Sequence, residues 1–381
     1  MADYLKHSHT LRWDIFCRVI DNFGDAGVAW RIARELTRRH GDEVTLMIDD
    51  VATLARIAPS VQAELRDQQA DGVRVVRWDD EFSLLDGVNV VVEAFGAALP
   101  DRYLDGMARR VARGAARPVW INLEYLSAEP WVPSYHLRRS PHPRLPLTKH
   151  FFFPGFGVGT GGLLRETDYV SAPVEPSAPN QPLQVSFFCY HNPNVVGLLD
   201  AMARGPRAVK LIVPDGLVVP QVRAWLESRP DHGAVVIEII PMTDQPGYDA
   251  LLQRCDLNFV RGEDSFVRAQ WAARPMVWQI YPQSEATHQV KLNAFLDRFC
   301  AHAGGRPIGC YRDFVTAWNA ADGGVDVDWL SLWAAMIESL DCLRDHAQEW
   351  RSELAQGPEL IEELVGFAEA LLAQSQGSVP N

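Results

Sequence analysis

Two aspartates in a short turn that contains glycine are the first residues of this chain able to do chemistry. The stretch DNFGDAG places Asp21 and Asp25 on either side of Gly24, between an expected strand and an expected amphipathic helix. Such a strand–turn–helix commonly binds a phosphate at the helix N-terminus, but two carboxylates would repel a phosphate. Either Asp25 caps a helix that begins near Ala26 while Asp21 orders the turn, or one carboxylate is a general base and the other its organiser. A carboxylate is also a natural partner for a guanidinium, which it binds through two parallel hydrogen bonds.

A second group of candidate residues follows an expected strand in the second half of the chain. The sequence LNFVRGEDSFVRAQWAA brings Arg261, Glu263, Asp264 and Ser265 to the start of a helix. Asp264 or Ser265 could simply cap that helix. Alternatively, helix N–H groups, the serine hydroxyl and the Arg261 guanidinium form a diphosphate site. The acidic pair suits sugar hydroxyls better than phosphate, which favours a nucleotide sugar over a bare nucleotide.

Aromatic and polar residues end two other expected strands of the second half. SFFCYHNP carries Tyr190 and Asn192, and WQIYPQ carries Gln279 and Tyr281. The aromatic rings could stack on a base, although packing alone explains either group equally well. The glycine run PGFGVGTGGLL, residues 154–164, lacks the strand and the acidic residue of a dinucleotide site, and we expect a flexible interdomain loop there.

The composition narrows the classes of function. At 381 residues the chain is long enough for two domains, and a net charge of −13 argues against nucleic acid as a partner. Basic clusters at 108–118 and 137–150 are either solvated faces or a docking surface for an acidic protein. The six cysteines are scattered without zinc spacing, no signal peptide is evident, and no apolar run approaches the roughly 20 residues of a membrane span. We therefore expect a cytoplasmic protein without a membrane segment.

The elements that must position these residues alternate between strands and helices. Apolar, β-branched runs such as 13–20, 43–50 and 88–96 suit a parallel sheet that is buried on both faces. A proline-rich segment, SAPVEPSAPNQP, has the composition of a linker, and the alternation restarts after it. We expect two doubly wound α/β domains with ligands at the carboxyl ends of their strands. The expected boundaries are 1–165 for an N-terminal domain, 166–183 for a linker, 184–357 for a nucleotide-sugar domain, and 358–381 for a terminal helix.

Three long stretches resemble one protein family closely. WDIFCRVIDNFGDAGVAWRIARELTRRHG, SFFCYHNP and CDLNFVRGEDSFVRAQWA are similar to the bacterial arginine rhamnosyltransferases that modify elongation factor P, the EarP family. The resemblance extends over most of the chain and includes its terminal helices. It implies a GT-B fold, with two Rossmann-like domains facing a cleft and a C-terminal helix that returns to the N-terminal domain.

The resemblance also implies an activity. The family transfers L-rhamnose from dTDP-β-L-rhamnose to one arginine of elongation factor P, with inversion and without a metal or other cofactor, and so supports translation of polyproline. The implied catalytic residues are Asp25 as the base, Asp21 and Glu263. The implied donor-binding residues are Asn22, Gly24, Phe188, Tyr190, Gln245, Arg261, Asp264, Ser265 and Tyr281. Met242 departs from the aromatic residue expected near the thymine, which weakens that one contact.

Two alternatives remain open. The motifs define the donor half better than the acceptor half, so a GT-B glycosyltransferase with another acceptor is the first. The second is an inactive nucleotide-sugar sensor that binds a translation factor. The presence of Asp21, Asp25 and Glu263 argues against a sensor, because a sensor needs no base.

Overall fold

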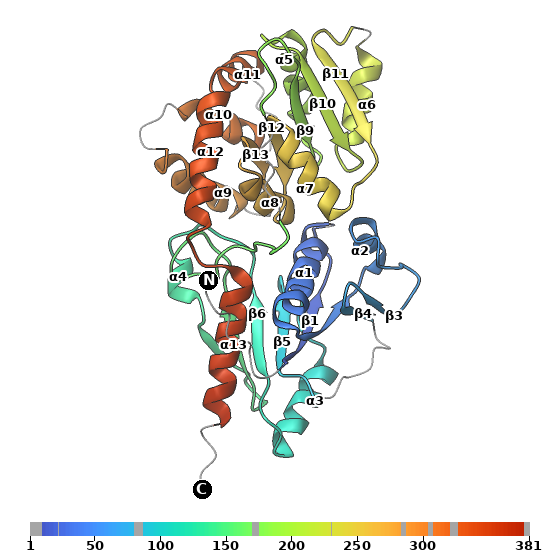
Figure 1. Ribbon diagram of the computed structural model, residues 1–381, viewed down its shortest axis with the longest axis vertical. Coiled ribbons are helices and arrows are strands. Elements are labelled where there is room, and N and C mark those ends of the chain that lie inside the picture. Colours follow the sequence, from blue (N-terminus) through green and yellow to red (C-terminus); the bar gives the residue numbers. More distant parts are fainter. Residues whose placement is uncertain are drawn as a thin grey trace. The chain divides into compact units, whose positions relative to one another are not determined.

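A computed structural model describes residues 10–21, 23–79, 87–169, 175–229, 231–282, 287–303, 308–320 and 327–376 (Figure 1). The chain divides into two compact units: Met1–Tyr169 together with Gly357–Asn381, and Val170–Gln356. Each unit is an α/β body built on one largely or wholly parallel sheet, so the predicted α/β class is confirmed. None of the helices in these ranges has the length and hydropathy needed to cross a bilayer.

The first unit contains a sheet of eight strands in the order β3-β4-β2-β1-β5-β6-β8-β7. Its central strands are parallel and almost entirely buried, as their apolar sequences predict. The two edge strands, β3 and β7, pair antiparallel with their neighbours. The bounds are β1 Arg12–Cys17, β2 Glu43–Ile48, β3 Asp67–Ala70, β4 Val73–Arg77, β5 Val90–Ala94, β6 Val119–Leu123, β7 Arg139–Pro141 and β8 Thr148–Phe152.

Helices pack on this sheet around an aromatic core. Phe16 of β1 lies edge-on to Trp78 and to Tyr103, with ring centroids 5.3 and 4.7 Å apart. Burying each such ring stabilises the fold by about 1.5–3 kcal/mol. The helices of this unit are α1 Phe23–Glu35, which continues as the π-helical turn η1 Leu36–His40, then α2 Val51–Ile57, α3 Asp101–Ala112, α4 Val132–Tyr135 and α13 Leu360–Gln376.

The last helix belongs to the first unit. In Figure 1, α13 runs beside β6, which it contacts, and its Phe367 ring lies 5.3 Å from the His150 ring of β8. The predicted return of the terminal helix to the N-terminal domain is thus confirmed.

The glycine run at 154–164 is packed within the first unit. Gly162 has φ +71°, and a Cβ there would lie 2.1 Å from the carbonyl oxygen of Pro358. A Cβ at Gly161 would lie 2.1 Å from the Phe152 ring. The prediction of a flexible interdomain loop is therefore wrong, because these glycines are needed for close approach of the chain to its neighbours.

The second unit contains a parallel sheet of five strands in the order β11-β10-β9-β12-β13. Phe187 of β9 is fully buried against Phe259 and Trp318, with ring centroids 5.1 and 5.7 Å away. The strands are β9 Leu183–Phe187, β10 Val209–Pro214, β11 Val235–Ile240, β12 Leu257–Arg261 and β13 Met276–Gln279. The helices are α5 Val195–Arg204, α6 Val219–Ser228, α7 Gln245–Arg254, α8 Asp264–Ala272, α9 Thr287–Ala301, α10 Gly309–Trp318, α11 Trp329–Glu338 and α12 Leu340–Leu354.

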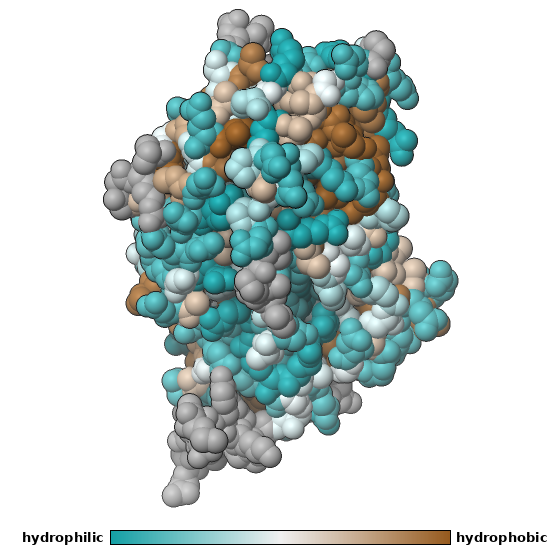
Figure 2. Space-filling model, turned by 45° about the horizontal axis from the view of Figure 1, so that its top comes forward, coloured by the Kyte–Doolittle hydropathy of each residue, from teal (hydrophilic) through white to brown (hydrophobic). Residues whose placement is uncertain are grey.

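The second unit also has a break between two consecutive helices and apolar residues exposed at its surface. The helices α11 and α12 follow each other directly and are separated only at Ser339. The edge strand β11 leaves Val236 65% exposed, and Leu217 ahead of α6 is 50% exposed. Figure 2 shows an apolar area on the visible face, amid largely hydrophilic surroundings.

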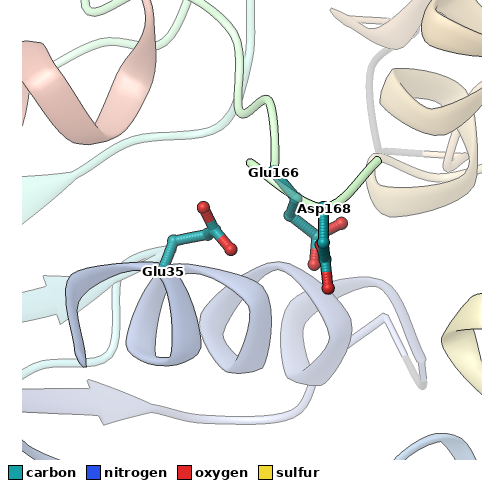
Figure 3. Close-up of side chains that lie close together, drawn as sticks. All are labelled: Glu35, Glu166 and Asp168. Carbon is teal, nitrogen blue, oxygen red and sulfur yellow. The ribbon is translucent and has the colours of Figure 1, made fainter. Parts of the chain in front are cut away.

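In the first unit, ion pairs link the end of α1 to the segment that contains Glu166 and Asp168. Glu35 of α1 points toward Glu166 and Asp168 of that segment (Figure 3), and their carboxylate oxygens all lie within 4.8 Å of one another. Arginines from α1 and η1 neutralise this cluster: Arg31 pairs with Glu166 at 2.5 Å and Arg38 with Asp168 at 2.5 Å. The cluster is thus an ion-pair network within the first unit.

Breaking the buried pair of this network is expected to destabilise the first unit. In Arg31→Ala, Glu166 would keep a charge in a site where its side chain is 4% exposed, so the free energy of unfolding should fall by about 3–5 kcal/mol. A urea titration followed by tryptophan fluorescence measures this loss. The matched control is Arg12→Ala, which breaks the exposed Arg12–Glu43 pair and should cost less than about 1 kcal/mol. Equal losses in the two variants would contradict the account.

Candidate active site

The first group of candidate residues lies where β1 gives way to α1. Asp25 is 2% exposed, and its Oδ2 accepts the N–H groups of Ile20 and Asp21, both at 2.8 Å. The helix begins at Phe23, not near Ala26, so Asp25 lies inside its first turn. Because both donors precede the helix, Asp25 closes the turn and does not cap α1. We call Asp21, Gly24 and Asp25 the aspartate turn.

Gly24 makes room for the second carboxylate of the aspartate turn. Its N–H donates to the carbonyl oxygen of Asp21 at 2.7 Å. A Cβ at position 24 would lie 2.7 Å from Oδ2 of Asp21, so any other residue would displace that carboxylate. Asp21 is 9% exposed. Because Gly24 has no Cβ, the Asp21 carboxylate can lie on the same short turn as that of Asp25.

The surroundings of Asp25 make it a stronger base than an ordinary carboxylate. Burial raises its pKa, and the charge of Asp49, which follows β2, raises it further. Hydrogen bonds from the backbone of Asp21 and Ile20 and from the Tyr125 side chain oppose that rise, since they favour the charged form. A carboxylate with a raised pKa at the carboxyl ends of parallel strands suits general base catalysis.

The second group of candidate residues lies where β12 gives way to α8, and we call Arg261 to Ser265 the arginine turn. Arg261 is 4% exposed, and its guanidinium lies over the rings of Phe188 and Tyr190, 4.4 and 4.7 Å from their centroids. Its Nη1 is buried and has no hydrogen-bond acceptor among the residues that the structure describes. A buried charged donor without an acceptor is costly, so this nitrogen suits an anionic ligand such as a phosphate.

The other members of the arginine turn either shape the turn or are partly buried acidic residues. Ser265 Oγ accepts the N–H of Arg261 at 3.0 Å and donates to its carbonyl oxygen at 2.5 Å, so it ties the turn to the strand. The N-cap of α8 is Glu263, neither Asp264 nor Ser265, and among the described residues the Glu263 side chain makes no capping hydrogen bond to the first N–H groups of this helix. Glu263 and Asp264 are both partly buried. Gly262 takes φ +59°, which lets the chain turn between strand and helix.

Aromatic rings continue from the arginine turn toward the surface. Tyr190 lies 5.5 Å from Tyr281, which is 39% exposed. Gln245 is buried as the first residue of α7. The structure thus groups Phe188, Tyr190, Arg261 and Tyr281 in the second unit, while Asn22 falls outside the described residues.

Some polar residues at the strand ends serve the fold. The Asn192 amide donates to the carbonyl oxygen of Trp318 at 2.8 Å, and Gln279 Oε1 accepts the N–H of Tyr190 at 2.9 Å. Sequence reasoning missed Tyr125 and Asp49, which surround Asp25. Each follows a buried strand, so the rule that ligands gather at strand carboxyl ends marks both as candidates, but the order of strands in the sheet decides that they meet Asp25.

Comparisons with known proteins place this chain in a family. A family model described as the elongation factor P rhamnosyltransferase EarP matches residues 13–369. The chain belongs to the EarP family. Protein-arginine rhamnosyltransferases of Pseudomonas aeruginosa and Pseudomonas putida are each 39% identical to it over 93% of this chain and 98% of the relative. EarP proteins are glycosyltransferases, and so is this chain.

Solved structures agree with the family. One, which gives the structural basis for EarP-mediated arginine glycosylation of translation elongation factor EF-P, is 28% identical, with a TM-score of 0.59 over 97% of this chain and 99% of that chain. A UDP-glucosyltransferase of Polygonum tinctorium, 10% identical, has a TM-score of 0.51 over 95% of this chain and 98% of that chain, and shares the fold alone. The predicted GT-B fold is thereby confirmed.

Adding one methyl group at Gly24 is expected to lower the activity of this EarP protein with little loss of stability. In Gly24→Ala the new Cβ would push the Asp21 carboxylate aside, and misplacing such a group costs about 10²-fold in kcat. Steady-state kinetics with thermal melting as a check on folding measure this. The control is Gly366→Ala in α13, where a Cβ would meet nothing within 4 Å. A Gly24→Ala enzyme with wild-type kcat would show that Asp21 needs no fixed position.

Proposed function

We propose that this chain transfers L-rhamnose from dTDP-β-L-rhamnose to an arginine side chain of elongation factor P, with inversion at the sugar and without a metal. The observation that carries the proposal is the buried Asp25 carboxylate, whose raised pKa suits a base. Membership of the EarP family supports both substrates. A nucleotide-sugar sensor would have no need of such a base.

On the acceptor side, Asp25 would take the proton from the attacking nitrogen. A guanidinium is a poor nucleophile, because it is protonated and delocalised up to a pKa of about 12 or more. As a nitrogen of the acceptor arginine bonds to C1 of the rhamnose, one of its protons would pass to Asp25. Asp21 would hold the guanidinium or the turn, and Glu263 would fix the sugar or the guanidinium.

On the donor side, the arginine turn would receive the charge that develops on the departing dTDP. The bond between C1 and the diphosphate oxygen breaks, and its electron pair stays on that oxygen. The Arg261 guanidinium and the N-terminus of α8 would stabilise this negative charge, a role that a metal ion has in other enzymes. Asp264 and Ser265 would contact the donor from the same turn.

The remaining donor contacts would surround the base and the sugar. Phe188, Tyr190 and Tyr281 would offer apolar faces, Gln245 a polar contact, and the backbone at Asn22 and Gly24 hydrogen bonds. Met242 can lie against the thymine because a thioether is polarizable. Attack from the face opposite the diphosphate inverts C1 in one step and needs no covalent enzyme intermediate.

The test combines purified protein, dTDP-L-rhamnose and elongation factor P, followed by intact mass. The expected result is a gain of one rhamnose on elongation factor P that persists after treatment with EDTA. No gain despite tight binding of dTDP would favour a sensor or another acceptor. A gain that EDTA abolishes and added Mg²⁺ restores would overturn the metal-free part of the proposal.

A further inference from the structure

Tyr125 reaches Asp25 from a distant part of the sequence. It follows β6, at the carboxyl end of the first unit's sheet, and its side chain hydrogen-bonds the Asp25 carboxylate. Its ring stacks on that of Phe95, with centroids 4.9 Å apart and planes 25° apart. The phenol is thus held from its flat side while its hydroxyl faces the carboxylate.

Phe95 adopts a backbone conformation that side chains other than glycine rarely take. Its φ is +57°, directly after the end of β5, and it is followed by Gly96 at φ +75°. Its N–H donates to the carbonyl oxygen of Leu123 at 2.8 Å, and its side chain is 3% exposed. Non-glycine residues in this region persist only where their surroundings enforce them, and they concentrate at functional sites. Here the left-handed turn carries the ring that backs Tyr125.

We propose that Tyr125, backed by Phe95, is a positioning residue for the base Asp25, an inference that rests on the function proposed above. Oδ2 of Asp25 is already bonded to the N–H groups of Ile20 and Asp21, both on the chain just ahead of α1. The Tyr125 hydroxyl donates from the segment after β6, so donors from two distant parts of the sequence hold the carboxylate. This hydrogen bond favours the ionised form of the carboxylate and orients it to accept the proton of the acceptor nitrogen.

The charges around Asp25 determine what the loss of this hydrogen bond does. Asp49 after β2 raises the pKa of Asp25, and Arg18 lies 3.9 Å from Asp49. The Cys17 thiol of β1 stays neutral, because burial and both aspartates raise its pKa. From α2, Arg56 lies over the ring of Phe23, 5.1 Å from its centroid. The Asp21 backbone N–H is retained in any Tyr125 variant.

Without the Tyr125 hydroxyl, the charged form of Asp25 loses one of its donors. The pKa of Asp25 therefore rises further, and a larger share of the enzyme carries a protonated, inactive base at low pH. The acidic limb of the kcat/KM profile should move to higher pH. A purely structural tyrosine would change stability without moving this limb.

The experiment compares full-length Tyr125→Phe with wild type in a pH series of kcat/KM for rhamnose transfer. We expect a loss of about tenfold near neutral pH, as for one hydrogen bond to a charged group, an acidic limb displaced to higher pH, and an unchanged KM for dTDP-L-rhamnose. The matched control is Tyr103→Phe, because Tyr103 also donates to a carboxylate, Asp14, at 2.5 Å, away from the aspartate turn. In Tyr103→Phe the acidic limb of the kcat/KM profile should stay at the wild-type pH.

The outcomes separate this inference from the proposed function. If Asp25→Asn is inactive while Tyr125→Phe has the wild-type rate and limb, the positioning role is wrong and the base stands. If Asp25→Asn keeps wild-type activity, the base itself is wrong. Should Tyr125→Phe fail to fold, Phe95→Leu decides, since it keeps an apolar side chain but removes the flat ring. A displaced limb in Phe95→Leu supports the inference, and an unmoved limb overturns it.

Discussion

Asp25→Asn is expected to lower rhamnose transfer by about 10²–10⁴-fold, the usual contribution of a general base. The amide oxygen of Asn can still accept the N–H groups of Ile20 and Asp21, so the aspartate turn should keep its shape. The amide cannot take up the proton of the acceptor nitrogen. Single-turnover kinetics on elongation factor P measure the loss, and titration calorimetry checks that dTDP still binds.

The same variant makes a prediction about stability. A carboxyl whose pKa is higher in the folded than in the unfolded state weakens folding once the pH exceeds its unfolded pKa. Burial raises the pKa of Asp25, so its charge opposes folding near neutral pH. Asp25→Asn should therefore melt no lower than wild type at that pH.

Two results would contradict the assignment of Asp25 as the base. One is an Asp25→Asn variant that keeps more than a tenth of the wild-type activity, and the other is an Asp25→Asn variant that loses activity only because it unfolds. The control is Asp341→Asn, whose side chain is 92% exposed.

Arg261→Ala is expected to weaken binding of dTDP-L-rhamnose by roughly 10- to 100-fold, as the loss of buried, charge-assisted hydrogen bonds does. In the structure the guanidinium is fixed over Phe188 and Tyr190 with Nη1 free of any acceptor among the described residues. A diphosphate oxygen would supply the missing acceptor. Calorimetry with dTDP measures the change in Kd.

Two further variants sharpen the Arg261 test. Arg261→Lys keeps the charge but loses the planar fork, so it should recover only part of the affinity. Arg223→Ala removes an exposed arginine of α6 in the same unit and should leave Kd unchanged. An Arg261→Ala variant that binds dTDP as tightly as wild type would remove the arginine turn from the donor site.

The architecture followed from the sequence to the extent that it depends on local apolar patterns. Runs such as WDIFC and VVVEA are buried on both faces, so they could be assigned to central parallel strands. The glycine run near Gly162 was misjudged because its purpose, contact with Pro358, depends on a segment far along the chain.

The candidate site was predictable as a set of residues but not as an arrangement. Asp21, Asp25 and Arg261 stand out because charged residues there follow apolar strands. The direction of the Asp25 hydrogen bonds, backward to Ile20 and Asp21, is set by where α1 begins, and that start was placed too late in the sequence. Tyr125 joins Asp25 only through the order of strands in the sheet, which no local pattern encodes.

Tandem mass spectrometry of elongation factor P tests the central claim most directly. Elongation factor P is incubated with dTDP-L-rhamnose and either wild-type enzyme or Asp25→Asn, each shown beforehand to bind dTDP. The account predicts one rhamnose on one arginine with the wild type and none, on the same time scale, with Asp25→Asn. No modified arginine with the wild type, or equal modification by both proteins, would contradict it.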